Sequence, residues 1–294
     1  MTSLAYYPGC SQTGTAKEYE MSVRACMKAL GVELAELEDW SCCGSTPAHT
    51  VDHTLAAALA ARNLRIAKDM NYSRVATPCP SCLSNLRNAE VRMEDEGFRK
   101  QVNELLDVPF EGGVHATSIL QVLFEEIGPK NIAAKAVKSM QGMIAAPYYG
   151  CIMNRPPDVM KFDDPENPIA MDEILKALGA EVPDFPVKLE CCGASYSVPR
   201  KDIVMNLTGR ILGVADRLGC NAVVVACPLC QQNLDLRQGQ VNSTNGTSYN
   251  IPVLYITQVI GLALGIAPEE LGLSKLVVSP SALIGKLGAK GDNA

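Results

Sequence analysis

The most informative feature of the sequence is a pattern of five cysteines that occurs twice. The first set consists of Cys10, Cys42, Cys43, Cys79 and Cys82. The second set consists of Cys151, Cys191, Cys192, Cys227 and Cys230. In each set a single cysteine is followed by a Cys-Cys-Gly doublet and then by a Cys-Pro-x-Cys pair, at similar spacing. Two such sets in one chain indicate a duplicated site rather than a chance CxxC motif.

The number of cysteines in each set indicates which metal they would bind. Soft thiolate ligands select zinc, copper(I) or iron–sulfur clusters. A structural zinc ion and an ordinary cubane cluster each take four protein ligands, so five thiolates exceed what either needs. The adjacent cysteines of a doublet diverge and reach two metal atoms of a larger cluster more readily than one ion. The pattern therefore favours a polynuclear iron–sulfur centre in each set, with zinc in one set as the less favoured alternative.

Composition and charge narrow the class of protein. The chain has 294 residues, of which 47% are hydrophobic and 20% charged, as in globular proteins with one two-lobed unit or two domains. The net charge of −6 provides no electrostatic footprint for nucleic acid. The first residues lack the basic and apolar regions of a signal peptide, and the longest apolar stretch, 253–267, is too short to span a bilayer. We therefore expect a cytoplasmic protein, in which disulfide frameworks are rare.

Elements that position the cysteines follow from hydrophobic periodicity. In the first half the sequence predicts strands over 4–9, 32–37, 74–78 and 114–120, and helices over 16–30, 51–70 and 90–104. In the second half it predicts strands over 143–149, 222–226 and 252–256, and helices over 169–178, 203–218 and 257–264. Residues 239–250 are polar and predict a loop, and the tail after Lys286 is expected to be loose.

This alternation of strands and helices predicts an α/β fold with two pseudo-symmetric Rossmann-like lobes. Each lobe should hold a mainly parallel sheet flanked by helices, with the lobes divided into residues 1–140 and 141–294. Ligands of such sheets gather beyond the carboxyl ends of the strands. The ten cysteines lie at predicted strand ends or in the loops that follow, so we expect the metal loops there.

Other reactive side chains have competing interpretations. Cys26 and Cys220 lie outside the repeat and are expected to be buried core residues. His49 and His53, four residues apart after the first doublet, could share a helical face and bind metal. His115 and Tyr255 occupy matching places in the two halves and are weak candidates for a proton donor near the clusters.

Basic side chains near the second set are candidates for binding an anionic substrate, although solvated surface charge is the more common role of such residues. They are Arg155, Arg200 and Lys201.

With both Cys-Cys-Gly motifs, the chain resembles the B subunit of heterodisulfide reductase over nearly its whole length. The resemblance implies that each set of five cysteines binds a noncubane [4Fe–4S] cluster, and that all ten ligands are present. It also implies a disulfide oxidoreductase that acts on the sulfur–sulfur bond. A small disulfide would sit between the two clusters, each cluster would capture one sulfur, and two electrons would release two thiols.

The resemblance also implies partners, because the chain lacks the compact cysteine run of ferredoxin-type cubanes and the GxGxxG loop of dinucleotide-binding proteins. Electrons would come from a partner that carries cubane clusters, the C subunit of the family, and this partner would be fed by the flavin-containing A subunit.

Two positions depart from the methanogenesis-related members of this family. Gly44 stands where they commonly carry proline, and Tyr255 stands where they tend to carry histidine. The substrate is therefore expected to be the coenzyme M–coenzyme B heterodisulfide or a related disulfide. The alternative function is electron transfer in a quinone-linked dehydrogenase of succinate, glycolate or lactate. A zinc-stabilised scaffold without catalytic activity is the second alternative.

Overall fold

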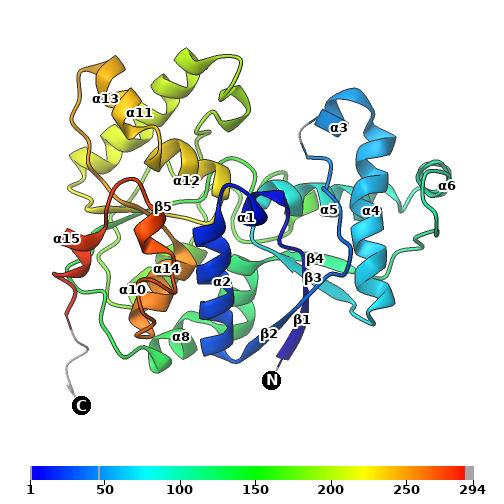
Figure 1. Cartoon of the computed structure of the whole chain (residues 1–294), viewed down its shortest axis with the longest axis horizontal. Coiled ribbons are helices and arrows are strands. Elements are labelled where there is room, and N and C mark those ends of the chain that lie inside the picture. The colour runs from blue at the N-terminus through cyan, green and yellow to red at the C-terminus, as the bar shows by residue number, and fades with distance from the viewer. Residues whose placement is uncertain (1, 46, 289–294) are drawn as a thin grey trace.

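The computed structural model describes residues 2–45 and 47–288 of the chain. Within these residues two parallel sheets are present, a four-stranded sheet in the first half and a three-stranded sheet in the second. Helices cover both sheets, which confirms the predicted α/β class and its two lobes (Figure 1). No helix within the same residues combines the length and the apolar character needed to cross a bilayer.

The first sheet has the strand order β2-β1-β3-β4. Its strands are β1 (Thr2–Tyr6), β2 (Val32–Glu36), β3 (Arg74–Thr77) and β4 (His115–Ser118). β1 pairs with both β2 and β3, and Tyr6 lies opposite Glu36 on one side and Ala76 on the other. Because all pairs are parallel, the carboxyl ends of β1 and β3 meet at one edge of the sheet.

The second sheet has the order β5-β6-β7, from β5 (Ala145–Tyr148), β6 (Ala222–Val225) and β7 (Val253–Tyr255). β6 is the central strand, and its residues are fully buried, as its run of three valines predicts. The segment that corresponds to β2 is reduced to a single bridge between Glu181 and Ile144. The carboxyl ends of β5 and β6 lie side by side, as those of β1 and β3 do.

The helices of the first half are α1 (Cys10–Thr13), α2 (Lys17–Leu30), α3 (Pro47–Val51), α4 (His53–Asp69), α5 (Pro80–Arg92), α6 (Glu96–Asn103), α7 (Ile119–Gln121), the π-helix η1 (Val122–Ile127) and α8 (Pro129–Lys135). Those of the second half are α9 (Pro157–Met160), α10 (Ala170–Ala177), the 3₁₀-helix η2 (Ala194–Tyr196), α11 (Lys201–Arg217), α12 (Pro228–Asp235), α13 (Gln238–Asn245), α14 (Ile256–Ala263), the 3₁₀-helix η3 (Leu273–Lys275) and α15 (Ser281–Ile284).

The two halves share a hydrophobic core. α2 of the first half packs against α14 of the second, near the middle of the molecule (Figure 1). At this contact the rings of Tyr19 and Tyr255 stack with centroids 3.9 Å apart, and the hydroxyls of Ser22 and Thr257 lie 2.7 Å apart. The predicted division between residues 140 and 141 falls between α8 and β5, but the buried core crosses it.

Two predicted helices of the first half are wrong in their bounds. The predicted helix over 51–70 is two helices, because the carboxylate of Asp52 accepts hydrogen bonds from the amides of Thr54 and Leu55 and caps α4. The predicted helix over 90–104 is also divided. α5 begins earlier, with Pro80 in its first turn, and Asp95 caps the separate helix α6 by accepting from the amide of Phe98.

In the second half the predicted loop over 239–250 contains helix α13. This helix buries Gln238 and Val241 and ends at Gly246, which adopts the left-handed conformation. The side chain of Gln238 exchanges two hydrogen bonds with the backbone of Ile251, so a polar residue anchors the helix where the sequence pattern shows no apolar stripe. Of the tail predicted to be loose, residues 289–294 lie outside the described part of the chain.

Candidate metal centres

Four strands deliver cysteines to two equivalent places at the sheet edges. Cys10 follows β1 and Cys79 follows β3, while Cys151 follows β5 and Cys227 follows β6. Cys79 and Cys227 are the N-cap residues of α5 and α12, and the second cysteine of each CPxC pair lies in the first turn of the helix. The backbone thus brings the single cysteine and the pair of each set to adjacent strand ends.

In the first set the doublet comes to the pair. The sulfur of Cys43 lies 3.5 Å from the sulfur of Cys82. The sulfur of Cys42 accepts a hydrogen bond from the amide of Gly44 at 3.4 Å. Cys10 and Cys42 are exposed, whereas the other three cysteines of the set are buried. The set therefore has an inner side within the protein and an outer side that opens to solvent.

The second set repeats this arrangement. The sulfurs of Cys192 and Cys230 lie 3.7 Å apart, and the amide of Gly193 donates to the sulfur of Cys191 at 3.2 Å. Cys191 is exposed and Cys151 half-buried, while the remaining three are buried. All twelve cysteines of the chain fall within the described residues and are free thiols, so the ten predicted ligands are brought together in two groups of five.

Two glycines give these groups their room. Gly9 precedes Cys10 and Gly150 precedes Cys151, both with positive φ, at 76° and 74°. A Cβ at Gly9 would lie 2.9 Å from the sulfur of Cys82, and one at Gly150 would lie 3.0 Å from that of Cys230. Any side chain at either position would occupy space beside the sulfur ligands. Both the conformation and the space thus require glycine.

A tyrosine and an asparagine in each half hold the doublets in place. The hydroxyl of Tyr7 donates to the carbonyl of Ser41 at 2.8 Å, and that of Tyr148 donates to the carbonyl of Glu190 at 2.5 Å. These carbonyls belong to the residues directly before the doublets. The amides of Asn85 and Asn233 donate to the carbonyls of Cys43 and Cys192 at 2.9 and 3.0 Å.

Sequence reasoning missed these four residues, although the sequence contains a signal for them. Each CPxC pair is followed by asparagine three residues after its second cysteine, and each single cysteine is preceded by a Tyr-Tyr dipeptide. Comparing the two halves residue by residue would have shown that the repeat extends beyond the cysteines.

Hydrogen bonds between thiols favour a thiolate in each group. The thiols of Cys42 and Cys82 donate to the sulfur of Cys43 and lower its pKa to about 4. A hydrogen bond from Cys151 lowers the pKa of Cys191 to about 6. Because the thiolate is the form that binds metal, each group contains a side chain that favours the ligating form.

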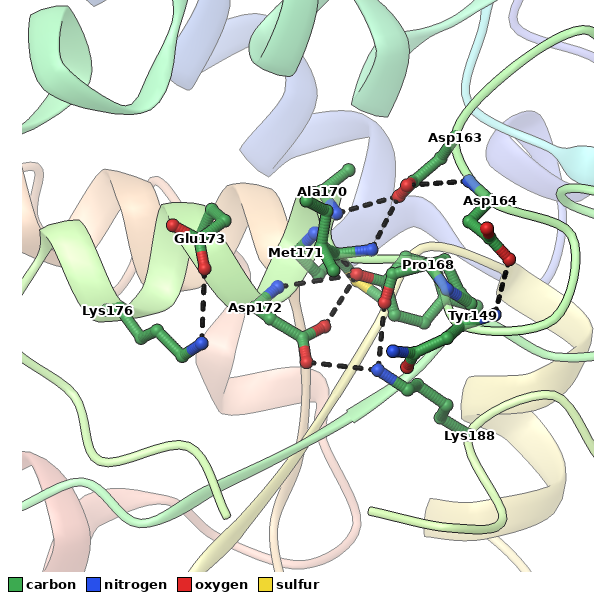
Figure 2. A network of polar contacts seen from close by, with 12 residues as sticks. Tyr149, Asp163, Asp164, Pro168, Ala170, Met171, Asp172, Glu173, Lys176 and Lys188 are labelled. Carbon is green, nitrogen blue, oxygen red and sulfur yellow. Dashed lines mark hydrogen bonds and ion pairs between the residues drawn. The ribbon is translucent and has the colours of Figure 1, made fainter. Parts of the chain in front are cut away.

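A buried ion pair supports the second group from below (Figure 2). The ammonium of Lys188 lies 3.2 Å from a carboxylate oxygen of Asp172 and donates to the carbonyl of Pro168 at 2.8 Å. The other oxygen of Asp172 accepts from the hydroxyl of Tyr149 at 2.7 Å. The carbonyl of Lys188 accepts the amides of Tyr149 and Gly150. This network fixes the segment before Cys151 against the segment that leads into the second doublet.

A cavity of about 750 Å³ lies between the two groups of cysteines. From the first half it is lined by Ser45, next to the first doublet motif, and Ser81, inside the first CPxC pair. From the second half it is lined by Ile152, Ser195 and Leu229, which are the neighbours of Cys151, the second doublet motif and the second pair. Both metal sites therefore border one shared space.

The structure does not bring the two proton-donor candidates to this cavity. His115 lies at the amino end of β4, opposite Arg74, and its ring nitrogen lies 2.8 Å from the carboxylate of Glu90. The cysteines follow the opposite ends of the strands, so the expected place of His115 near the first cluster is wrong. Tyr255 is completely buried under Tyr19, with burial raising its pKa, and its hydroxyl points to Glu18.

Most other candidates are also accounted for. Cys26 and Cys220 are buried core residues, as predicted. Arg155 is paired with Glu166, and Arg200 with Asp202, and neither of them nor Lys201 lines the cavity. His49 and His53 lie on the separate helices α3 and α4, but both line the cavity.

The donor set fits a polynuclear iron–sulfur cluster better than a single ion. Within residues 2–45 and 47–288, no three histidine, cysteine, aspartate or glutamate side chains have the arrangement of a single-ion site. Each group instead offers five soft sulfur donors around a glycine that leaves space beside them. Such a set matches cysteine-bound iron–sulfur clusters, whose sulfurs also accept backbone hydrogen bonds.

Comparisons with known proteins agree with this site. The model of the cysteine-rich CCG domain matches residues 4–87 and 145–235, which contain the two groups. The 8-methylmenaquinol:fumarate reductase membrane anchor subunit of Wolinella succinogenes is 36% identical, over 95% of this chain and 98% of the relative. The B subunit of the ferredoxin:CoB-CoM heterodisulfide reductase of Methanosarcina mazei is 29% identical, over 98% and 97%. An Archaeoglobus profundus protein described as similar to the heterodisulfide reductase B subunit is 29% identical, over 92% and 93%.

A crystal structure of a hypothetical protein from Helicobacter pylori has the same fold, with a TM-score of 0.76 at 13% identity. The match covers 95% of this chain, which spans about half the length of that protein.

These relatives support an oxidoreductase role within a multi-component complex, with iron–sulfur chemistry at the cysteines. The family match covers both halves of the chain and most of its cysteine motifs. The chain belongs to the cysteine-rich CCG domain family and carries two copies of that domain.

Proposed function

We propose that this chain is the catalytic iron–sulfur component of a heterodisulfide-reductase-like complex and reduces a small disulfide to two thiols. The observation that carries the proposal is the cavity between the two cysteine groups, which is bordered by the neighbours of both doublets and both CPxC pairs. A ligand in this space has access to both metal sites at once. Cleavage of a disulfide requires this, because two sulfur atoms separate and both must be held.

Ten cysteines would hold the cofactor, as two noncubane [4Fe–4S] clusters of five ligands each. When bound, the clusters supply one-electron reduction at two points of the same cavity. The chain itself positions the ligands through Tyr7, Tyr148, Asn85 and Asn233, and Gly9 and Gly150 leave the space beside the sulfurs. Zinc in one set stays the less favoured alternative.

The cavity lining suits a disulfide that carries anionic groups. Among the described residues that line it, His49, His53 and Arg92 are basic, and none is acidic. Polar side chains such as Ser84 and Asn88 complete the first-half wall, while the second half contributes Ile152 and Leu229. A ligand with a charged end and an apolar chain would match these two walls.

Electrons would come from partner proteins, because the chain contains neither a ferredoxin-type cysteine run nor a dinucleotide-binding glycine loop. We propose a cubane-cluster protein, the C subunit of such a complex, as the direct donor, and the flavin-containing A subunit behind it, in the cytoplasm. The name of the relative from Methanosarcina mazei, one lettered component of a reductase, supports an assembly of this kind.

A second candidate function is electron transfer to or from a quinone. It is favoured by the relative from Wolinella succinogenes, whose name specifies 8-methylmenaquinol and which is 36% identical to this chain. In that case the cavity would hold a quinone head group in place of a disulfide.

The test uses the chain reconstituted with iron and sulfide under anaerobic conditions. We expect about four iron and four sulfide per group of cysteines. We also expect turnover of the coenzyme M–coenzyme B heterodisulfide, or of a related disulfide, with reduced methyl viologen. Cys42→Ser should abolish turnover, while Cys220→Ser, outside both groups, should retain it. Turnover of menaquinone analogues with no turnover of any disulfide would favour the second candidate, and zinc without sulfide would refute both.

A further inference from the structure

The proposed reaction needs two protons as well as two electrons, and the structure indicates which side chains supply them. Reduction of a disulfide follows RS–SR′ + 2 e⁻ + 2 H⁺ → RSH + R′SH. The sulfur–sulfur bond breaks, two S–H bonds form, and one-electron iron–sulfur donors of the complex provide the electrons. The inference therefore rests on the proposed function and concerns the source of the protons.

Few groups that border the cavity exchange protons near neutral pH. The lining in the described part of the chain consists of serine, threonine, asparagine and alkyl side chains, Arg92, and two histidines. Hydroxyl and amide groups keep their protons in this range, and a guanidinium stays charged. Imidazole is the side chain that ordinarily exchanges a proton between pH 5 and 8. His49 and His53 are thus the suitable donors among these residues.

The two histidines are carried by helices that pack on the first doublet. The amide of His49 donates to the carbonyl of Gly44, directly after the doublet, at 3.3 Å. α4, which begins with His53, packs on the same glycine, since a Cβ at Gly44 would lie 3.3 Å from the Cα of Ala56. Both imidazoles are therefore fixed relative to the first metal site. Both are also accessible to solvent, so that they can be reprotonated from it.

The charged groups around the histidines are few. Asp52 lies between them in the chain and interacts electrostatically with His53. Arg92 of α5 lines the same cavity. α6 also packs against α4, but it contributes none of the described lining residues. The residues of the second-half wall, Ile152, Ala194, Ser195 and Leu229, carry no group that titrates near neutral pH.

We propose that His49 and His53 donate the protons that convert the released thiolates to thiols, from the first-half side of the cavity. They take the role for which His115 and Tyr255 were the sequence-based candidates. The two halves then differ in function despite their similar cysteine groups, because the segment after Gly193 has no histidine that matches His49.

The experiment compares the reconstituted chain with a His49→Asn, His53→Asn double variant, with reduced methyl viologen and the coenzyme M–coenzyme B heterodisulfide. Loss of a general acid lowers the rate by about 100-fold or more. We expect that loss at neutral pH, with wild-type iron and sulfide content and a pH profile flattened between about pH 6 and 8. His115→Asn, which changes the remaining histidine outside the cavity, is the matched control and should keep the wild-type rate.

A second measurement requires no variant. Wild-type protein is treated with diethyl pyrocarbonate, with and without the heterodisulfide, and the modified histidines are identified by mass spectrometry. We expect the heterodisulfide to protect His49 and His53 but not His115. If the double variant loses its clusters, this protection pattern decides the question. Equal modification with and without the heterodisulfide, or a wild-type rate and pH profile in the double variant, overturns the proton-donor role.

Failure of the proposed function itself has a different signature. If wild-type protein with full iron and sulfide content reduces no disulfide, the disulfide reductase proposal fails, and the proton-donor role falls with it. If the wild type reduces the heterodisulfide and the double variant does so equally well, only the proton-donor role fails.

Discussion

The side-chain amide of Asn233 donates hydrogen bonds to two atoms of Cys192, the carbonyl oxygen at 3.0 Å and the sulfur at 3.6 Å. In the first half Asn85 makes the matching contact with the carbonyl of Cys43 at 2.9 Å. Both asparagines are three residues after the second cysteine of a CPxC pair, so one turn of α5 or α12 places them on the same helical face as that cysteine. The duplicated site therefore includes its supporting hydrogen bonds.

Replacing Asn233 is expected to change the second metal centre electronically. Hydrogen bonds to ligand sulfurs raise the reduction potential of iron–sulfur clusters, because they stabilise the more negative, reduced state. Asn233→Ala should therefore lower the potential of one centre in a redox titration followed by electron paramagnetic resonance. It should also cost about 1–3 kcal/mol in stability, because the buried carbonyl of Cys192 loses its partner. Asn85→Ala is the matched control for the carbonyl contact, and an unchanged potential in Asn233→Ala would contradict the role of the sulfur contact.

Gly9 and Gly150 are expected to be essential for cluster assembly in their own halves. Gly9→Ala would place a methyl group 2.9 Å from the sulfur of Cys82, at a backbone φ of 76° that already disfavours alanine. We expect the variant to fold and to bind about half of the wild-type iron, as measured by iron and sulfide analysis after reconstitution.

Gly112→Ala separates the two causes of that loss. Gly112 has a φ of 82°, but a Cβ there would meet no atom within 4 Å. It therefore reproduces the backbone strain, which costs of order 1–3 kcal/mol, without the contact with sulfur. Full iron content in Gly112→Ala together with half content in Gly9→Ala is the expected result. Equal iron content in the two variants would show that the space beside Cys82 is not needed.

Much of this site could be predicted from the sequence because it repeats there. The Cys-Cys-Gly and CPxC motifs identify ten ligands, and the alternation of strands and helices places them at the carboxyl ends of strands. The structure has these features, with the ligands in two groups of five around one cavity. Local composition was sufficient where apolar residues formed a periodic pattern, as in the valines of β6.

The predictions failed where side chains decide the local structure. Asp52 and Asp95 divide two expected helices by capping new ones, and Gln238 anchors α13 in a segment with loop-like composition. Direction along a strand also mattered. His115 and Tyr255 occupy matching segments, but His115 lies at the amino end of β4, whereas Tyr255 is the last residue of β7. A sequence pattern identifies a strand without showing which of its residues reaches the site.

The pH dependence of stability is expected to reveal Asp235, a buried carboxyl group on α12. It accepts the amides of Val277 and Val278 at 2.8 and 2.9 Å, but burial is the larger effect and raises its pKa. A raised pKa in the folded state gives stability that is present at low pH and is lost as pH rises through the folded-state pKa. The free energy of unfolding of wild type relative to Asp235→Asn should therefore fall as pH increases from about 4, the ordinary value for aspartate. Denaturant titrations between about pH 4 and 7 would measure it, and a difference that rises with pH would contradict this assignment.

The buried pair of Lys188 and Asp172 is expected to control the stability of the second half. Lys188 is 7% exposed and Asp172 is 8% exposed, and the pair links the segment before Cys151 to the segment before Cys191. Lys188→Met would leave the carboxylate of Asp172 buried without its cation, which costs about 3–5 kcal/mol. The Lys188→Met, Asp172→Asn double variant should recover part of that loss, because no unpaired charge remains.

Lys176 and Glu173, on the same helix as Asp172, provide the control for this prediction. Their charged atoms lie 3.1 Å apart, but both side chains are about half exposed (Figure 2). Exposed pairs contribute about 0–1 kcal/mol, so Lys176→Met should unfold at nearly the wild-type denaturant concentration. Because Lys188 supports the backbone on both sides of the second cysteine group, Lys188→Met should also reduce the iron bound there, and Lys176→Met should not. Wild-type stability in Lys188→Met would show that the ion pair does not hold these segments together.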